Sequence, residues 1–383
     1  MSLRNIIDAV RASRQRPSSE DASISLEFDP HQDAVIIVYL FRGIGDAALL
    51  VPVLSAFKDR YPETRLGVIV SDLVAKTLAL FELDVTLFQV PNEWFENTEA
   101  LTKSQRSQMS RLEAKTKKNI KSAGFTVGIE LTGNGSVPAS DWLDDLQLRY
   151  TIGWAPNTFS LDVPTTRQYF RFDHSVNDIR FQADRHWSFA LCQAFSIFGL
   201  DGPDLSIRIP VSKRACNWAE NQWGDGFRIL IFPGSRDSKK RWNPNRFSTI
   251  VNKLLRTHEV STIVSGAPKE AALVDQVRRG INDSTCRYTG RNLGRLLALI
   301  QTASIVITND TGPMHLSYLS GVPTVAVYKY MSPIVWGPIQ PKREFLIIET
   351  HHRSDDEIST QILRFIRQRL RRARFAQFKR KNV

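Results

Sequence analysis

Short apolar, β-branched segments alternate with segments of helical character along this chain, and the alternation occurs twice. The first series is predicted to contain the strands AVIIVYLF (34–41), RLGVIV (65–70), DVTLFQV (84–90) and VGIEL (127–131). Between them we expect a helix from Asp46 to about Tyr61, ended by Pro62, and a charged helix around 100–123. Uninterrupted apolar strands are typical of parallel sheets that are covered on both faces. The first series therefore predicts a doubly wound α/β domain.

The second series predicts another domain of the same kind. Its strands are RILIFPG (228–234), STIVSG (261–266), a short strand near 286, SIVITN (304–309) and VPTVAVY (322–328), with helices that begin near 244, 268, 293 and 312. Between the two series, the clearest signals are a helix near 184–199 and a proline-containing link around 202–210. We therefore predict an α/β fold of two doubly wound, Rossmann-like domains facing a cleft. The expected boundaries are an irregular segment at 1–30, a first domain at 31–208 and a second at 209–350.

The last segment, 351–383, is predicted to hold a helix and a basic tail. Ser354 and Glu357 form a capping-box pattern, and an apolar stripe follows at helical spacing, so this helix must dock on something. From Arg364 onward there are nine Lys or Arg residues and no acid, and most of the net charge of +12 lies there. We expect disorder after about Leu370, with an anionic membrane surface as the alternative state of the tail. No nucleic-acid-binding module is recognisable, so we expect no nucleic-acid partner.

Composition limits the remaining classes of protein. The chain has 383 residues with 42% hydrophobic content and no apolar run of the roughly 18 residues that a membrane span needs. Its amino terminus lacks the apolar core of a signal peptide. The three cysteines, at no metal-like spacing, favour a reducing compartment over a disulfide framework or a zinc site. We expect a soluble, cytoplasmic protein without a metal.

The informative segments follow predicted strands, where ligands of such sheets normally bind. FPGSRDSKKRW (232–242) offers backbone amides from Gly234 onward, the Ser235 hydroxyl and the cations Arg236 and Lys240. Concave amides and an ammonium group suit a diphosphate. The alternative is a solvated basic loop.

A second candidate segment is TNDTGPMHLSYLSGVPTVAVY (308–328). It places Asp310, Thr311 and Gly312 at a strand end and a helix start, where helix amides attract anions and a carboxylate accepts hydrogen bonds from sugar hydroxyls. His315 is expected to point toward the same cleft. The alternative is a helix cap and a packed histidine. Glu270, in SGAPKE, is either a ribose ligand or an ordinary first-turn glutamate.

The stretch FRGIGDAALL (41–50) has a glycine-x-glycine-x-x-alanine pattern from Gly43, which suggests a dinucleotide loop. Asp46 stands where a phosphate would lie and would repel it, so we favour a carboxylate displayed for chemistry. Because a helix terminus favours the ionised form, we expect the pKa of Asp46 to be lowered. Two alternatives stay open: a simple N-cap, and a dinucleotide site with Asp72 as the ribose-binding acid.

These motifs together resemble glycosyltransferase family 9, which contains the bacterial lipopolysaccharide heptosyltransferases. The resemblance rests on GIGDAALLVPVLSAFKDRYP (43–62), PGSRDSKKRWNPNRF (233–247), SGAPKE, NDTGPMHLSYLSGVPTVAVY (309–328) and PIVWGP (333–338). Their order and spacing match over roughly 34–340. The resemblance implies a glycosyltransferase fold of the B type, an inverting and metal-independent mechanism, and an ADP-activated heptose as donor.

The resemblance also implies roles for particular residues. Asp46 matches the catalytic base and Lys240 the lysine on the donor phosphates. The other donor-binding positions it implies are Gly234, Ser235, Arg236, Glu270, Asp310, Thr311, Gly312 and His315. Acceptor-side positions are Arg42, Gly43, Gly45 and Asn134; Arg42 and Gly43 replace the paired serines of many members. The chain has no aspartate-x-aspartate string, which supports neutralisation of the diphosphate by Lys240 and loop amides.

The sequence thus predicts a transferase that moves a heptose or similar sugar to a saccharide or lipid-linked acceptor, with no cofactor, peripheral at the inner face of the inner membrane. An alternative is a transferase of the same fold with another nucleotide sugar and a capsule, O-antigen or protein acceptor. Two other classes remain: a non-catalytic binding protein of glycan assembly, and a nicotinamide-dependent oxidoreductase.

Overall fold

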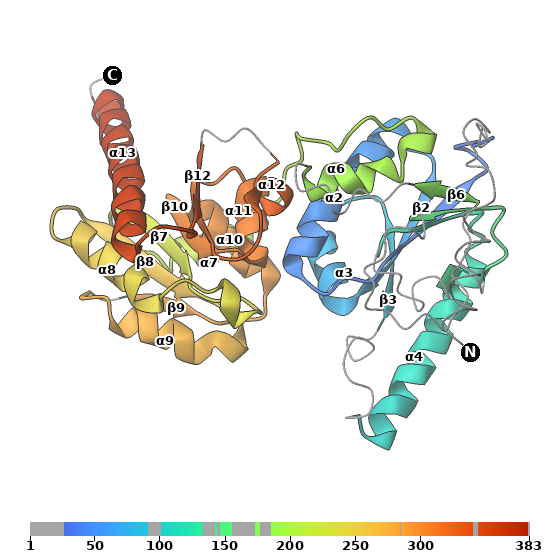
Figure 1. The fold of residues 1–383 in the computed structure, drawn as a ribbon, viewed down its shortest axis with the longest axis horizontal. Helices are drawn as coiled ribbons and strands as arrows, with labels where there is room; N and C mark the ends of the chain where they lie inside the picture. Colours follow the sequence, from blue (N-terminus) through green and yellow to red (C-terminus); the bar gives the residue numbers. More distant parts are fainter. Residues whose placement is uncertain are drawn as a thin grey trace, which may run out of the picture.

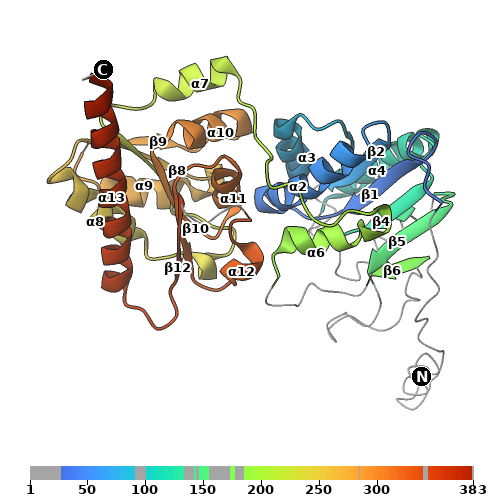
Figure 2. The same ribbon diagram turned by 90° about the horizontal axis from the view of Figure 1, so that it is seen from above.

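The structure is a computed structural model, which describes residues 27–90, 101–132, 142–143, 146–154, 173–176, 185–283, 285–339 and 344–381. The described strands form two parallel sheets of six strands each. Each sheet belongs to one domain, and the two domains lie side by side (Figures 1 and 2). The predicted fold class, two doubly wound α/β domains, is confirmed.

The first sheet has the strand order β3-β2-β1-β4-β5-β6. Its strands are β1 (Ala34–Tyr39), β2 (Arg65–Ser71), β3 (Thr86–Val90), β4 (Val127–Glu130), β5 (Tyr150–Trp154) and β6 (His174–Val176). The central strand β1 pairs in parallel with β2 and β4, so that Ile37 lies between Val68 and Ile129. Every residue of β1 is buried, as expected for a strand covered on both faces.

The helices of the first domain are α2 (Ile44–Arg60), α3 (Asp72–Leu78), α4 (Lys103–Ser122) and α6 (Trp187–Gln193). Helix α2 begins two residues before the predicted start because Gly43, not Asp46, is its N-cap residue. Past α6, a 3-10 turn (Ser196–Phe198) closes at Gly199 with φ of 72°, a conformation that favours glycine. The helix predicted near 184–199 is therefore shorter than expected, because α6 ends at Gln193 and the 3-10 turn before Gly199 is a separate element.

The second sheet has the order β12-β11-β10-β7-β8-β9. Its strands are β7 (Phe227–Phe232), β8 (Val260–Ser265), β9 (Cys286–Tyr288), β10 (Ile305–Asn309), β11 (Thr324–Tyr328) and β12 (Phe345–Glu349). Its helices are α7 (Lys213–Glu220), α8 (Pro244–Leu255), α9 (Ala271–Arg279), α10 (Leu293–Thr302), α11 (Gly312–Leu319), α12 (Pro333–Trp336) and α13 (Asp355–Lys381). The strand order reverses between the neighbours β7 and β10, which is where doubly wound sheets bind ligands.

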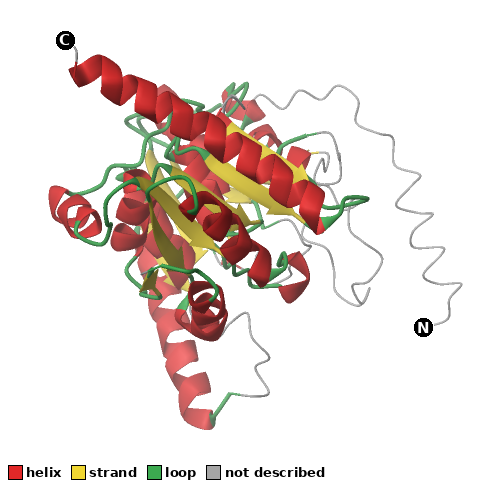
Figure 3. Cartoon of the chain, turned by 90° about the vertical axis from the view of Figure 1, so that its left-hand side faces the viewer, coloured by secondary structure: helices red, strands yellow, loops and turns green. Residues whose placement is uncertain are grey.

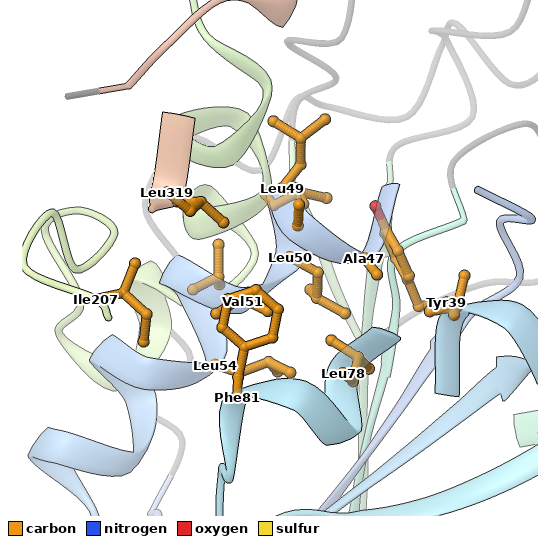
Figure 4. Close-up of a cluster of buried hydrophobic side chains, with 14 of the residues drawn as sticks. Tyr39, Ala47, Leu49, Leu50, Val51, Leu54, Leu78, Phe81, Ile207 and Leu319 are labelled. Atoms are coloured by element: carbon orange, nitrogen blue, oxygen red, sulfur yellow. The ribbon is translucent and has the colours of Figure 1, made fainter. Parts of the chain in front are cut away.

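The two domains share one hydrophobic cluster. It contains residues of α2 and α6 from the first domain together with residues of α10 and α11 from the second. Part of it is drawn in Figure 4, where Leu319 of α11 joins Leu49 and Val51 of α2 and Ile207 of the link. Helices α2 and α11 therefore pack directly on each other and bring the starts of both helices to the junction between the domains.

The last helix, α13, lies along the outer side of the second domain (Figure 3). Its stripe of Ile358, Ile362, Ile366 and Leu370 is buried in the core of that domain, so the predicted docking is confirmed. The predicted disorder after Leu370 is wrong, because the helix continues to Lys381. The segment beyond Leu370 contains no glycine or proline and is rich in good helix formers, which allows the docked helix to extend. No helix of the described ranges is long and apolar enough to cross a membrane.

Candidate active site at the junction between the domains

Asp46 is held at the start of α2 by two hydrogen bonds. The backbone N–H of Gly43 donates to Oδ2 of Asp46 at 2.7 Å, which is the carboxylate half of a capping box. The hydroxyl of the buried Tyr39, at the end of β1, donates to the backbone carbonyl oxygen of Asp46 at 2.9 Å. The alternative of a simple N-cap at Asp46 is therefore wrong, because Asp46 is the third residue of the helix; its bond to the N-cap residue Gly43 fixes where the carboxylate lies.

The carboxylate of Asp46 faces cations of the second domain. A Cβ placed on Gly43 would lie 2.6 Å from Oδ2 of Asp46 and 3.1 Å from a guanidinium nitrogen of Arg236. The charges of Arg236 and Lys240 both act on Asp46 to lower its pKa. A carboxylate from the first domain thus lies within the electrostatic influence of two cations from the second.

The predicted lowering of the Asp46 pKa is wrong, because its pKa is raised above the ordinary value. Burial is the largest cause, since it penalises the charged form. Arg236, the backbone N–H groups of Gly43 and Arg42, and Lys240 oppose this effect without cancelling it. The sequence-based expectation included the helix terminus but not the loss of water around the carboxylate in the folded protein. A raised pKa makes Asp46 a stronger base than expected.

The loop that follows β7 is tied to the end of β10. The side-chain amide of Asn309 donates to the carbonyl oxygen of Pro233 at 2.8 Å, and the buried Ser235 hydroxyl donates to the carbonyl oxygen of Asp310 at 3.2 Å. Arg241 donates twice to the carbonyl oxygen of Ser235, at 3.0 and 2.7 Å. These bonds hold the predicted phosphate loop in one shape beside the start of α11. Sequence reasoning did not single out Asn309, although it opens the NDTG string.

Lys240 and Asp310 form an ion pair inside this loop arrangement. The Nζ of Lys240 lies 2.8 Å from Oδ2 of Asp310, and their side chains are 25% and 6% exposed. Both residues were predicted to contact the donor, and the structure places them together. A phosphate that binds the Lys240 ammonium must therefore either share this ammonium with Asp310 or displace the Asp310 carboxylate from it.

Helix α11 begins close to α2 because glycines stand on both sides. A Cβ on Gly45 would lie 2.7 Å from Cδ2 of His315, and a Cβ on Gly312 would lie 2.7 Å from Cβ of Ile44. Thr311, the N-cap residue of α11, makes no capping bond through its side chain. The predicted positions Gly45, Gly312 and His315 thus meet at one point of the junction.

His315 is buried and neutral at this contact. Burial is the main cause that lowers its pKa to about 3, and the charges of the nearby His186 and Lys240 contribute. A neutral imidazole fits against the backbone of Gly45 without bringing another charge to the junction. His315 is therefore a packed histidine beside the other predicted donor-site residues, and its contact with the donor stays a prediction.

Glu270 occupies the first turn after β8. Its Oε2 accepts from the backbone N–H of Ala267 at 2.8 Å, which is the ordinary helix-start interaction. The same carboxylate fills the space that a Cβ of Gly234 would need, so it also touches the phosphate loop. The structure thus brings Glu270 to the rim of the predicted donor site.

A second contact between the domains lies beside this site and was not predicted. Nε2 of His186, at the start of α6, lies 3.0 Å from the carbonyl oxygen of Gly337. The rings of Trp187 and Trp336 pack at 5.4 Å with an angle of 30°. Trp187 also hydrogen-bonds Tyr39 through its side chain. This contact therefore reaches the turn that carries Asp46.

For two of the predicted acceptor-side residues, Arg42 and Asn134, the structure gives little information about side-chain contacts. Arg42 is exposed, and its backbone N–H interacts with Asp46. Asn134 lies outside the described residues. Within the described part of the chain, no three His, Cys, Asp or Glu residues are grouped as a metal site would need.

The fold is that of glycosyltransferases of the B type, with two Rossmann-like domains. The sequence model of glycosyltransferase family 9 (heptosyltransferase) matches residues 113–363. The chain belongs to this family.

Curated relatives support the assignment over shorter segments. The chain is 26% identical over 113 residues to the lipopolysaccharide core heptosyltransferase OpsX of Haemophilus influenzae, covering 29% of this chain and 32% of the relative. It is 29% identical over 111 residues to a lipooligosaccharide heptosyltransferase 2 of Campylobacter jejuni, covering 27% of this chain and 34% of the relative. The chain thus matches about a third of the length of these relatives.

Solved structures show the same fold over nearly the whole chain. A family 9 glycosyltransferase from Veillonella parvula has a TM-score of 0.71 at 18% identity, covering 90% of this chain and 99% of that one. The ADP-heptose lipopolysaccharide heptosyltransferase II of E. coli has a TM-score of 0.68 at 17% identity, covering 89% and 99%. E. coli heptosyltransferase WaaC with ADP has a TM-score of 0.65 at 15% identity, covering 88% and 99%.

Proposed function

We propose that this glycosyltransferase moves a heptose, or a similar sugar, from an ADP-activated donor to a saccharide hydroxyl of the lipopolysaccharide core or a related surface glycan. Family membership and the names of the relatives support this choice of sugar and acceptor. One observation carries the proposed chemistry: the Asp46 carboxylate meets Arg236 and Lys240 across the junction between the domains. The proposed base would thus lie opposite cations that can neutralise a departing diphosphate.

In the proposed reaction, Asp46 accepts the proton of the acceptor hydroxyl while its oxygen attacks the anomeric carbon of the donor. The bond from that carbon to the diphosphate oxygen breaks, and the leaving group takes the electron pair. Because attack and departure occur on opposite faces, the anomeric configuration inverts. The raised pKa of Asp46 favours this role, since a base with a higher pKa takes a proton earlier in the transition state.

The developing negative charge of the diphosphate would be met by groups of the second domain, without a metal. Lys240 supplies a positive charge, and a guanidinium nitrogen of Arg236 supplies a second one beside the turn that carries Asp46. The start of α11 supplies backbone N–H groups near Thr311 and Gly312 and the favourable end of a helix dipole. Preorganised donors of this kind stabilise charge more effectively than mobile water.

The ion pair between Lys240 and Asp310 suggests how the donor enters. We propose that phosphate oxygens take over the ammonium of Lys240, which frees the Asp310 carboxylate to accept hydrogen bonds from hydroxyls of the donor sugar. Ser235 and Gly234 shape the phosphate loop, and Glu270 at its rim is the proposed ribose ligand. His315, being neutral, holds the contact with Gly45.

On the acceptor side we propose contacts from the turn at Arg42, Gly43 and Gly45, and from Asn134. Because the proposed acceptor is lipid-linked and the donor is a nucleotide sugar, we propose that the protein works in the cytoplasm, peripheral at the inner face of the membrane. The same fold with another nucleotide sugar is the competing assignment. Family membership disfavours an oxidoreductase, and the capping carboxylate of Asp46 occupies the anion position that a dinucleotide phosphate would need.

Calorimetry with ADP, UDP, GDP and NAD tests the donor. We expect ADP to bind best and to lose affinity in Lys240→Met. Tighter binding of UDP or GDP would move the assignment to another nucleotide sugar. Mass spectrometry of surface glycans from cells with and without the gene tests the acceptor; the expected difference is a loss of heptose from the core.

A further inference from the structure

Helices α8 and α13 lie next to each other on the outer side of the second domain (Figures 1 and 2), and basic side chains of both line the space between them. Lys253 of α8 and Arg364, Arg367 and Arg371 of α13 line a groove of about 730 Å³, which we call the α8–α13 groove. Thr360 and Gln368 add polar groups to its wall. We propose that this groove is the surface by which the protein docks on an anionic lipid bilayer.

The helical repeat explains why these cations share one face. Arg364, Arg367 and Arg371 stand at spacings of three and four residues, so they line one side of α13. The residues of the apolar stripe stand between them in sequence and point into the domain core. Helix α13 is thus anchored through one face and presents a row of charges about 10 Å long on another.

The four cations of the groove have no counter-ion of their own. In the part of the chain that the structure describes, none of them forms an ion pair or a side-chain hydrogen bond, and all four are exposed. Nearby acids are already used: Arg246 pairs with Asp355 and Asp356.

Arg369 shows the contrast within the same helix. Its guanidinium lies 2.6 Å from Oε2 of Glu344 and over the ring of Phe365, and only 8% of its side chain is exposed. It is a structural cation, paired and packed against its own domain. The groove cations are instead available to an external anion.

The form of the surface favours a plane of many phosphates over one small anion. The groove is open and runs along a helix, and it lies away from the strand ends where the donor site is built. Beyond Arg371 the sequence of α13 continues with five more basic residues and no acid. Each Lys or Arg near an anionic membrane strengthens binding by about 1 kcal/mol, which is roughly fivefold. A continuous basic helix therefore suits a lipid surface.

A second basic helix provides a matched control. Lys103 and Arg111 line a hollow on α4, and both are exposed. Helix α4 belongs to the first domain and lies at the other end of the molecule from α13 (Figure 1). Removing the same number of charges there separates an effect of position from an effect of net charge.

The test is co-sedimentation of the full-length protein with vesicles of phosphatidylglycerol and phosphatidylcholine, or of phosphatidylcholine alone. We expect binding to the anionic vesicles only, weakened on the order of 30-fold in R364Q/R367Q and at most a few-fold in K103Q/R111Q. The variant R364K/R367K keeps the charges and should bind like the wild type. Circular dichroism checks that each variant is folded.

Other results overturn the proposal. Equal binding to neutral vesicles, or equal losses in the α4 and α13 variants, would show that the groove is not the docking surface. Displacement by millimolar inorganic phosphate would indicate a site for a small anion. Tighter binding to a short oligonucleotide than to vesicles would indicate a nucleic-acid surface. Membrane contact is part of the proposed function, but this assay involves no sugar transfer, so either proposal can fail without the other.

Discussion

Nε2 of His186 lies 3.0 Å from the carbonyl oxygen of Gly337, so one imidazole joins the first domain to the second. Nδ1 of the same ring accepts from the backbone N–H of Ser188 at 3.2 Å, which requires that Nδ1 carry no proton. The proton of the neutral ring therefore lies on Nε2 and is donated to Gly337. Protonation of Nδ1 would break the bond to Ser188.

This contact predicts a loss of stability in mild acid. Burial lowers the pKa of His186 to about 4, below the ordinary value of 6.5. Since the unfolded chain binds the proton more tightly, the stability from neutral His186 is complete above pH 6.5 and is lost as the pH falls toward 4. The full difference is about 3 kcal/mol.

The measurement is urea unfolding at pH 7 and pH 5 for wild type and His186→Asn. Asparagine keeps an acceptor for the N–H of Ser188 but cannot reach Gly337. His315 titrates in both proteins, so the difference between them reports His186. We expect the variant to be less stable at pH 7 and to lose less stability on acidification. If the free energy of unfolding changed with pH equally in the two proteins, His186 would not be the cause of the acid destabilisation.

The ion pair between Lys240 and Asp310 predicts that a second substitution can restore the free energy of unfolding of a Lys240 variant without restoring its activity. In Lys240→Met the nearly buried Asp310 carboxylate loses its partner, at a cost of roughly 1–3 kcal/mol. In the double variant Lys240→Met/Asp310→Asn, no unpaired charge remains, so most of that stability should return. Activity should stay about 10²-fold or more below wild type in both, because the charge that meets the diphosphate is gone.

Thermal unfolding and initial rates test this prediction in the same samples. A double variant as unstable as Lys240→Met would show that the lysine stabilises the fold by packing and not by pairing. A double variant with normal turnover would remove Lys240 from the proposed mechanism.

The close approach of α2 and α11 predicts that Gly45 tolerates no side chain. The Cβ of Gly45→Ala would press on the buried ring of His315, so the domains must separate or the ring must move. We expect a loss of about 1–3 kcal/mol from overpacking, together with a fall in turnover. Gly294→Ala is the control, since its Cβ would meet only Asn292 at 3.4 Å inside α10 and should be neutral or slightly stabilising. Equal unfolding temperatures for the two variants would contradict the tight contact.

Many of the strands and turns could be predicted from the sequence because a buried parallel strand and the turn after it are specified by consecutive residues. The strands around β1 and β7 and the turn at Asp46 were found in this way. Strands β5 and β6 and helix α7 were not, since their segments lack a long apolar run.

Pairings across the junction depend on distance in space and not on sequence pattern. His186 and Gly337 are 151 residues apart, and Lys240 and Asp310 are 70 apart. The sequence names Lys240 and Asp310 as ligands of a donor but not as partners of each other. The direction of the Asp46 pKa shift was missed because burial in the folded protein raises the pKa more than the nearby cations and N–H groups lower it.

Asp46→Asn is the variant that tests the proposed base. The amide oxygen of asparagine can still accept the N–H of Gly43, so the start of α2 should be kept, while the group can no longer take a proton. We expect turnover to fall by about 10²–10⁴-fold. ADP affinity, measured by calorimetry, should change little, because the proposed donor contacts belong to the second domain.

The pH profile gives an independent reading of the same group. Since only the ionised carboxylate acts as a base, wild-type turnover should fall on the acid side with a pKa above the ordinary aspartate value. Asp46→Glu keeps a carboxylate but moves it, so this variant should retain some activity. Its turnover should also fall at acidic pH, with a pKa set by the new glutamate. If Asp46→Asn kept both the wild-type rate and its acidic limb, another group would be the base and the junction geometry would need a different explanation.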